Sequence, residues 1–169
     1  MQSTQAVKIA SVQQLDITLM GKVNYVACDF EKNSLEERLH SSGFDRRKKT
    51  FFSWLGVVPY LDITAIEETL KFVASCAPGS AMVFDYIVVK NNLNEMEQLI
   101  VNLLSTQLAA GGEPLKSFFD PQQLKEKLEE LGFTQIKDIG PDYLNENYLS
   151  SREDGLRVGN VTRIFKVTV

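Results

Sequence analysis

The segment FFSWLGVVPYL, residues 51–61, decides how the fold of this chain is interpreted. Its apolar and aromatic run breaks at Gly56 and resumes at Pro59, which is typical of a buried strand followed by a turn that lines a cleft. In nucleotide-type domains such a strand usually follows a glycine-rich loop, but the first glycine of this chain is Gly21. We therefore expect the chain to correspond to the second half of such a domain.

Length and charge limit the classes of protein that need to be considered. The 169 residues are enough for one domain with a sizeable apolar core, and no linker or repeat divides them, so residues 1–169 are interpreted as a single domain. The formal net charge of -4 argues against a nucleic acid partner, because affinity for phosphates depends on clustered Lys and Arg. The one basic run, residues 46–49, indicates either a solvated loop or a contact with an anion.

Cysteine and histidine usage predicts neither disulfides nor a metal site. Cys28 and Cys76 lie in apolar segments, where a free cysteine behaves as a small hydrophobic residue. His40 is expected at the surface of a polar helix end, and no pair of Cys or His residues has metal-binding spacing. No leader peptide opens the chain and no apolar run reaches the roughly 18 residues of a membrane span. We expect a cytoplasmic protein with no membrane partner.

Apolar periodicity predicts alternating helices and strands along the first half of the chain. Helices are expected to start near Ser3 or Thr4, at Ser34, and at Asp62 or Thr64, because each of these residues can cap a helix. Strands are predicted between these helices, at Val23–Phe30 and Phe51–Leu55.

The second half continues the alternation and then changes. Ala81–Val89 is nearly continuous in apolar residues, as in a parallel strand covered on both faces, and a helix is predicted from Leu93 to the Gly111–Gly112 pair. A second helix is expected from the Asp120–Pro121 pair to Gly132. Two strands, Phe133–Ile139 and Val161–Val169, flank the polar stretch 141–159. The order predicts a mostly parallel three-layer α/β/α sandwich with an antiparallel C-terminal edge.

Several stretches, taken together, resemble a known family. They are VNYVACDFE at 23–31, SGFD at 42–45 before the opening segment, APGSAMVFDY at 77–86, and GEPLKSFFDP, LEELGF and SREDGLRVG in the tail. Each is short, but their order and spacing are specific. The chain resembles the C-terminal portion of class I S-adenosylmethionine-dependent methyltransferases, in particular the bacterial O-methyltransferase branch of the leucine carboxyl methyltransferase family.

This resemblance implies a partial Rossmann-like methyltransferase fold, with the methyl donor S-adenosylmethionine across the carboxyl ends of the strands. It also implies that the family's glycine loop and first two strands precede the chain. In the family's strand order the two absent strands lie between the segments matching Val23–Phe30 and Phe51–Leu55. We expect these edges to close up side by side, or to pair in a homodimer, or to be completed by a separately encoded N-terminal half.

On the donor side, the resemblance implies roles for two groups of residues. Asp29 and Phe30 match the pair that binds the adenine edge and packs on its ring; the alternative is that Asp29 is a carboxylate near the helix start at Ser34. The other group is the strand exit Ser53, Trp54, Leu55 and Gly56. Leu55 stands where many members of the family have a glutamate, so Trp54 and Leu55 are expected to pack or to line the pocket.

On the substrate side, the resemblance implies four residues. Tyr60 is expected to border the substrate or to be a buried tyrosine with a satisfied hydroxyl. Asp85 and Tyr86 end the apolar core of their strand near the same face. Arg152, with Asp154 and Arg157, matches a tail segment that approaches the substrate, although a polar loop explains these charges equally well.

The chemistry implied is the in-line transfer of a methyl group to an oxygen of a small-molecule or carboxylate acceptor. A carboxylate is already ionised at neutral pH, so the reaction asks for proximity more than for a strong base, and no catalytic residue stands out. Three interpretations remain open. They are a complete enzyme, a piece that regains its site by dimerising or by pairing with a separate half, and a non-catalytic vestigial, binding or oligomerisation protein of the same fold.

Overall fold

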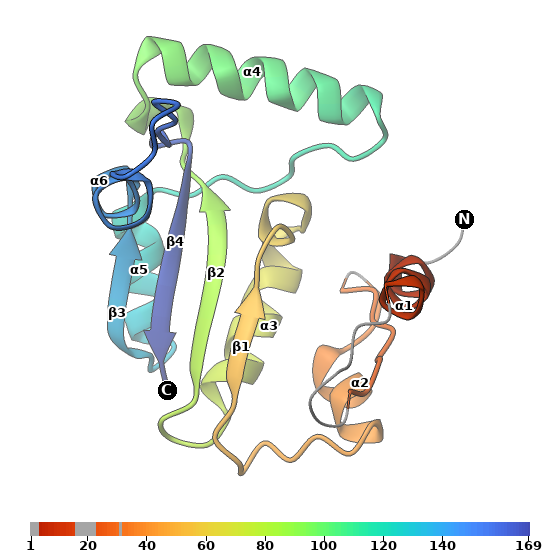
Figure 1. Ribbon diagram of the computed structural model, residues 1–169. Helices are drawn as coiled ribbons and strands as arrows, with labels where there is room; N and C mark the ends of the chain where they lie inside the picture. Colours follow the sequence, from red (N-terminus) through yellow and green to blue (C-terminus); the bar gives the residue numbers. More distant parts are fainter. Residues whose placement is uncertain (1–3, 16–22, 31) are drawn as a thin grey trace. The chain divides into compact units, whose positions relative to one another are not determined.

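The computed structural model describes residues 4–15, 23–30 and 32–169. The chain divides into two compact units, residues 1–45 and 46–169, which are described separately (Figure 1).

The first unit contains two helices, α1 (Thr4–Gln14) and α2 (Leu35–Ser41). Both were predicted. Ser34 caps α2 as its sequence spacing indicates, because its hydroxyl accepts a hydrogen bond from the Glu37 backbone N–H at 3.3 Å. Thr4 is the first residue of α1 and not a flanking cap, and Ser3 lies outside the described residues.

The predicted strand Val23–Phe30 is wrong. Residues 23–29 have no regular secondary structure, and the C=O of Asp29 accepts hydrogen bonds from the N–H groups of Lys32 and Asn33 at 3.0 and 2.8 Å. The segment therefore ends in a turn. A strand exists only as part of a ladder, and the sheet formed by the described residues consists of four other segments. A run of alternating apolar residues does not by itself show that a neighbouring strand is present to form the ladder.

The second unit is built on a four-stranded sheet with the order β1-β2-β4-β3. Its strands are β1 (Phe51–Trp54), β2 (Ala81–Ile87), β3 (Thr134–Ile139) and β4 (Thr162–Thr168). β1 and β2 are parallel, and β4 runs antiparallel to both β2 and β3. The predicted antiparallel pair at the C-terminal side of the sheet is confirmed, with β4 inside the sheet and β3 at its edge.

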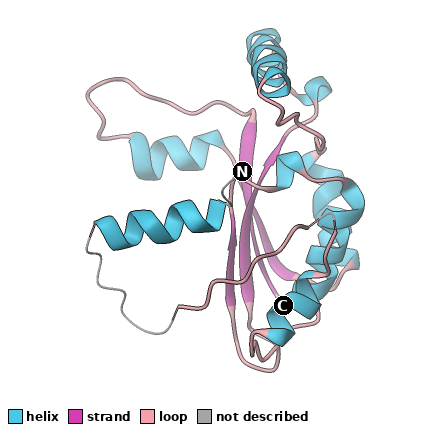
Figure 2. Cartoon of the chain, turned by 90° about the vertical axis from the view of Figure 1, so that its right-hand side faces the viewer, coloured by secondary structure: helices cyan, strands magenta, loops and turns pink. Residues whose placement is uncertain are grey.

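Helices connect these strands close to the predicted positions. They are α3 (Ile63–Ala74), α4 (Glu95–Ala110), α5 (Pro121–Glu130) and α6 (Pro141–Leu144), with short 3-10 turns at Val58–Tyr60 and Lys90–Asn92 and a π-helix at Asn145–Leu149. The polar stretch 141–159 is therefore helical in its first half, which periodicity did not predict. The twist of the sheet is visible in Figure 2.

The core lies on one face of the sheet, against α3 and α5, which are behind the strands in Figure 1. Phe84 of β2 is at its centre. Its ring lies 6.4 Å from that of Trp54 on β1 and 5.8 Å from that of Phe165 on β4. Tyr86 stacks on Phe165 at 5.1 Å. Because successive residues of a strand point to opposite faces, the side chain of Asp85 is directed away from this core.

A polar network joins three strands beside the core. The Tyr86 hydroxyl donates to Asp138 Oδ1 at 3.0 Å, and Arg163 Nε and Nη2 donate to Asp138 Oδ2 at 3.0 and 2.8 Å. Arg163 Nη1 also donates to Asn160 Oδ1 at 2.6 Å. Burial of the phenol, followed by the negative charge of Asp138, raises the pKa of Tyr86.

Gly140 is required by this network rather than by its backbone conformation. A Cβ at Gly140 would lie 2.6 Å from Arg163 Nη1, so Gly140→Ala should displace the guanidinium and weaken its pairing with Asp138. We expect a loss of about 1–3 kcal/mol in the free energy of unfolding, measured in urea. Gly111→Ala is the control, because its nearest atom is 3.4 Å away, and should change stability by less than about 0.5 kcal/mol. Equal effects of the two variants would contradict this role.

The raised pKa of Tyr86 predicts a loss of stability at alkaline pH. Above about pH 10 the unfolded chain releases the phenol proton while the folded chain still holds it, so the free energy of unfolding falls as pH rises. Tyr86→Phe has no such proton. It should be less stable at neutral pH but should lose stability less steeply above about pH 10 in denaturation series. An unchanged alkaline slope would show that Tyr86 does not cause it.

Candidate functional site

The carboxyl ends of β1 and β2 open into a pocket of about 450 Å³. Its apolar wall comes from the end of β1, from α6, from β4 and from the loop before β4, and consists of Leu55, Leu144, Val158, Val161 and Ile164. The polar lining residues are Asp85 of β2 and Thr162 of β4. The carboxyl edge of a parallel pair is where α/β folds bind ligands, and the volume falls in the range of small-molecule sites.

Asp85 organises the turn that closes one side of the pocket. Its Oδ1 accepts a hydrogen bond from the Gly56 N–H at 2.7 Å. Gly56 has a φ of 71°, and a Cβ on it would meet no atom within 4 Å. A glycine suits this left-handed position, and the space beside it is open. Asp85 therefore holds the Leu55–Gly56 turn while its carboxylate lines the pocket.

The opposite wall is held by hydrogen bonds between segments far apart in the sequence. Asn145 and Val158 form a reciprocal pair, with the Asn145 side-chain amide N–H donating at 3.0 Å and its Oδ1 accepting at 2.9 Å. Glu97 Oε2 accepts from the Asn94 N–H at 3.1 Å within the capping box of α4, and its Oε1 accepts from the Asn160 N–H at 2.7 Å. The loop before β4 is thus tied to both the π-helix and α4.

Four of the predicted residues meet at or near this pocket. Leu55 and Asp85 line it, Gly56 forms its turn, and Ser53 is exposed on the same strand. Trp54 lies between them in sequence but points to the other face, where it is buried against Phe84.

Two further predicted residues are placed elsewhere. Tyr60 is half-buried in the 3-10 turn that follows β1. Tyr86 lies on the core face of β2, with its hydroxyl on Asp138, so it does not line the pocket.

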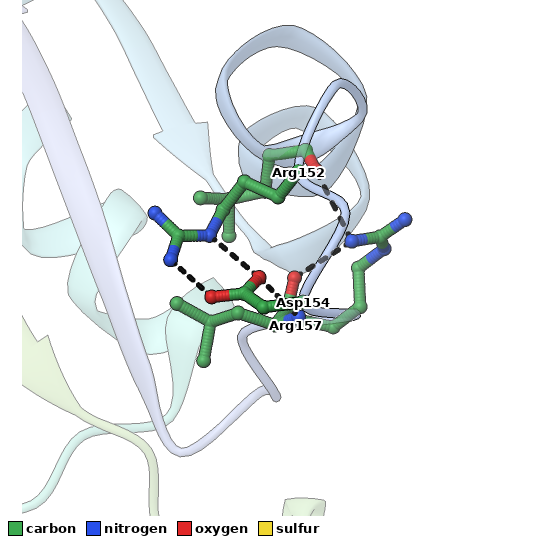
Figure 3. A network of polar contacts seen from close by, with 5 residues as sticks. Arg152, Asp154 and Arg157 are labelled. Atoms are coloured by element: carbon green, nitrogen blue, oxygen red, sulfur yellow. Dashed lines mark hydrogen bonds and ion pairs between the residues drawn. The ribbon is translucent and has the colours of Figure 1, made fainter.

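Arg152 is engaged within its own loop. Its guanidinium forms a two-contact ion pair with Asp154, with Nε donating to Oδ1 at 2.9 Å, as Figure 3 shows. This contact holds the pKa of the Asp154 carboxyl below its usual range. Arg157 donates to the carbonyl oxygens of Leu149 and Leu156 at 3.1 and 2.7 Å. These contacts lie within the loop itself, and the approach of Arg152 to a substrate stays a prediction.

Asp29 and Phe30 belong to the first unit. The Asp29 carboxylate forms an ion pair with Lys32 at 3.0 Å in which both side chains are substantially exposed, and the Asp29 N–H donates to Asn33 Oδ1 at 3.3 Å. This arrangement suits a carboxylate in a turn before α2. The adenine-binding role of Asp29 and Phe30 stays a prediction.

The sequence did not identify Leu144, Val158, Thr162 and Ile164 as site residues. Thr162 and Ile164 lie on the Asp85 face because Asp85 is the register partner of Ile164. Strand alternation alone divides β4 into two faces, but only the register with β2 shows which face meets Asp85.

Within the described ranges, no group of three or more His, Cys, Asp and Glu side chains could hold a metal ion. No helix among the same residues combines the length and the hydropathy needed to cross a membrane.

Removal of the Asp85 carboxylate should loosen the pocket turn. Asp85→Ala deprives the Gly56 N–H of its acceptor, so we expect a loss of about 1 kcal/mol in the free energy of unfolding and faster hydrogen exchange at the Gly56 amide. Asp85→Asn should retain most of the protection, because its amide oxygen can still accept. An unaltered exchange rate of the Gly56 amide in Asp85→Ala would contradict the stabilising role of this hydrogen bond.

The sequence comparisons agree with this fold. Residues 1–74 match the family model for leucine carboxyl methyltransferase. A relative in Bacillus subtilis (strain 168), named "Putative S-adenosyl-L-methionine-dependent methyltransferase YktD", is 32% identical over 163 residues, which cover 91% of this chain and 51% of that protein. The chain therefore spans about half the length of this relative.

Solved structures share the arrangement of the strands and helices at low sequence identity. A DUF574 family protein from Streptomyces avermitilis superposes with a TM-score of 0.59, at 13% identity, covering 97% of this chain and 62% of the other. The S-adenosylmethionine-dependent methyltransferase SibL gives 0.58 at 11% identity, covering 98% and 41%. These likenesses confirm the predicted Rossmann-like methyltransferase fold. The sequence matches show that this chain is similar to the leucine carboxyl methyltransferase family over residues 1–74 and to the Bacillus subtilis relative over 91% of its length.

Proposed function

We propose that this chain forms part of an S-adenosylmethionine-dependent O-methyltransferase, and that the pocket at the ends of β1 and β2 takes the methyl acceptor. The observation that carries the proposal is this pocket itself, an apolar recess with one carboxylate at the carboxyl edge of the parallel pair. The similarity of the chain to the leucine carboxyl methyltransferase family model and to the Bacillus subtilis relative supports the same assignment.

The end of β1 fits one part of the methyl donor. Ser53, Leu55 and Gly56 are exposed, and the space beside Gly56 is open, so a ligand can approach the backbone there. The Asp85 carboxylate beside this turn also suits a positively charged group. When bound, S-adenosylmethionine supplies a methyl group on a sulfonium, which an oxygen nucleophile can accept.

The residues of the chain contribute position rather than acid or base strength. Leu55, Leu144 and Ile164 exclude water from the acceptor, and the Asp85–Gly56 hydrogen bond fixes the wall against which it rests. Confining an acceptor oxygen in this way lowers the entropic cost of reaching the transition state. A carboxyl or a hydroxyl oxygen could serve as the acceptor.

Calorimetric titration with S-adenosylmethionine tests the proposal. The wild-type chain should bind the cofactor in the micromolar range. Leu55→Arg places a cation at the pocket and should weaken binding by about tenfold or more, since a guanidinium repels a sulfonium. Leu103→Arg on α4 is the matched control, because Leu103 is 57% exposed and Leu55 is 51% exposed, and it should bind as the wild type does.

Failure to bind would change the assignment. No heat with millimolar S-adenosylmethionine would overturn the proposal for this chain and favour a non-catalytic protein of the same fold. Equal weakening in Leu55→Arg and Leu103→Arg would place the cofactor away from the end of β1.

A further inference from the structure

We infer that the pocket at the end of β1 and β2 selects a neutral acceptor, an apolar molecule with a hydroxyl or phenol group, and rejects a carboxylate. The inference rests on the proposed function, because it names the substrate class of the same site. It departs from the carboxyl acceptor that the name of the family suggests.

The described lining of the pocket carries a negative charge without a balancing positive one. Among the described residues that line the pocket, Asp85 is the one that is ionisable, and none of them is Lys, Arg or His. A carboxylate ligand would therefore meet a like charge without a compensating cation. Like charges in a partly desolvated site repel strongly, and an anion that loses water there needs a donor to replace it.

Three cations of β4 and of the segment before it are engaged elsewhere. Arg163 is held by Asp138 and Asn160, and it is the register partner of Tyr86 on the core face of β2. Arg152 is held by Asp154, and Arg157 donates to two backbone carbonyls of the loop. None of the three lines the pocket, so none is placed to neutralise an anionic ligand.

Asp85 retains hydrogen-bonding capacity for a ligand. One of its oxygens accepts from Gly56, and this is its one hydrogen bond among the described residues. A carboxylate has about four acceptor positions. The side chain can thus accept a further hydrogen bond from a hydroxyl, whereas a carboxylate ligand has no proton to donate at neutral pH. Thr162 at the rim can either donate or accept.

The rest of the lining is mostly apolar. The other walls are aliphatic, with Leu144 and Ile164 on two sides, and the volume of about 450 Å³ admits a ring with a short side chain. An apolar body with one hydroxyl matches this distribution of one acceptor and several aliphatic side chains.

Two probes of the same shape test the inference, namely 4-propylphenol, which is neutral, and 4-propylbenzoate, which is an anion. In calorimetric titrations of the chain at neutral pH, the phenol should bind about tenfold or more tightly than the benzoate. In Asp85→Asn, which removes the charge but keeps an oxygen for the Gly56 N–H, the ratio should fall to about threefold or less. Glu130→Gln, an exposed carboxylate of α5, is the charge control and should leave the ratio unchanged.

The outcomes separate this inference from the proposed function. Preference for the benzoate, binding of neither probe, or an unchanged ratio in Asp85→Asn would overturn the inference. Ile164→Trp fills the pocket and should abolish binding of the phenol; retained binding would place the probe elsewhere and also overturn it. If the chain binds the phenol as expected but shows no heat with S-adenosylmethionine, the inferred ligand preference of the pocket stands and the methyltransferase assignment is wrong.

Discussion

The alternation of side chains along β2 is the constraint on which the site depends. Phe84 and Tyr86 point into the core, where they stack with Phe165, and Asp85 between them must then point to the opposite face. Burial of each large aromatic side chain contributes roughly 1.5–3 kcal/mol, and burial of an unpaired carboxylate would cost several kcal/mol more. A slip of one residue would exchange these faces. The packing of the core thereby places the Asp85 carboxylate in the pocket, although no local sequence motif specifies this position.

The two sides of the pocket are stabilised in different ways. On the β1 side, a single hydrogen bond from Gly56 to Asp85 joins the exits of two adjacent parallel strands. On the other side, Glu97 joins the first turn of α4 to the segment before β4. The spacing of Asn94 and Glu97 is that of a capping box, but the second contact of Glu97, with the Asn160 N–H, is seen only in the structure. A residue that caps a helix here also positions a wall of the candidate site.

The polar network of Tyr86, Asp138 and Arg163 serves the fold and not the pocket. Its members come from β2, β3 and β4, and it closes beside Gly140. Strand alternation places Arg163 on the core face of β4, opposite Tyr86, and Asp138 pairs with it there. Arg163 therefore contributes no positive charge to the pocket side of β4.

Most of the element types and bounds, and the resemblance to the family, could be predicted from the residues alone. Capping at Ser34, the Asp120–Pro121 helix start and the apolar run of β2 depend on neighbouring residues, so they were readable without the fold. The prediction of a strand at Val23–Phe30 was wrong because a strand needs a hydrogen-bonded neighbouring strand, which apolar periodicity does not predict. Three features followed from the fold and not from any local pattern: Ile164 stands opposite Asp85, Tyr86 points away from the pocket, and Leu144 completes its lining. Strand register and loop closure join residues distant in the chain, and a pattern of nearest neighbours carries no information about them.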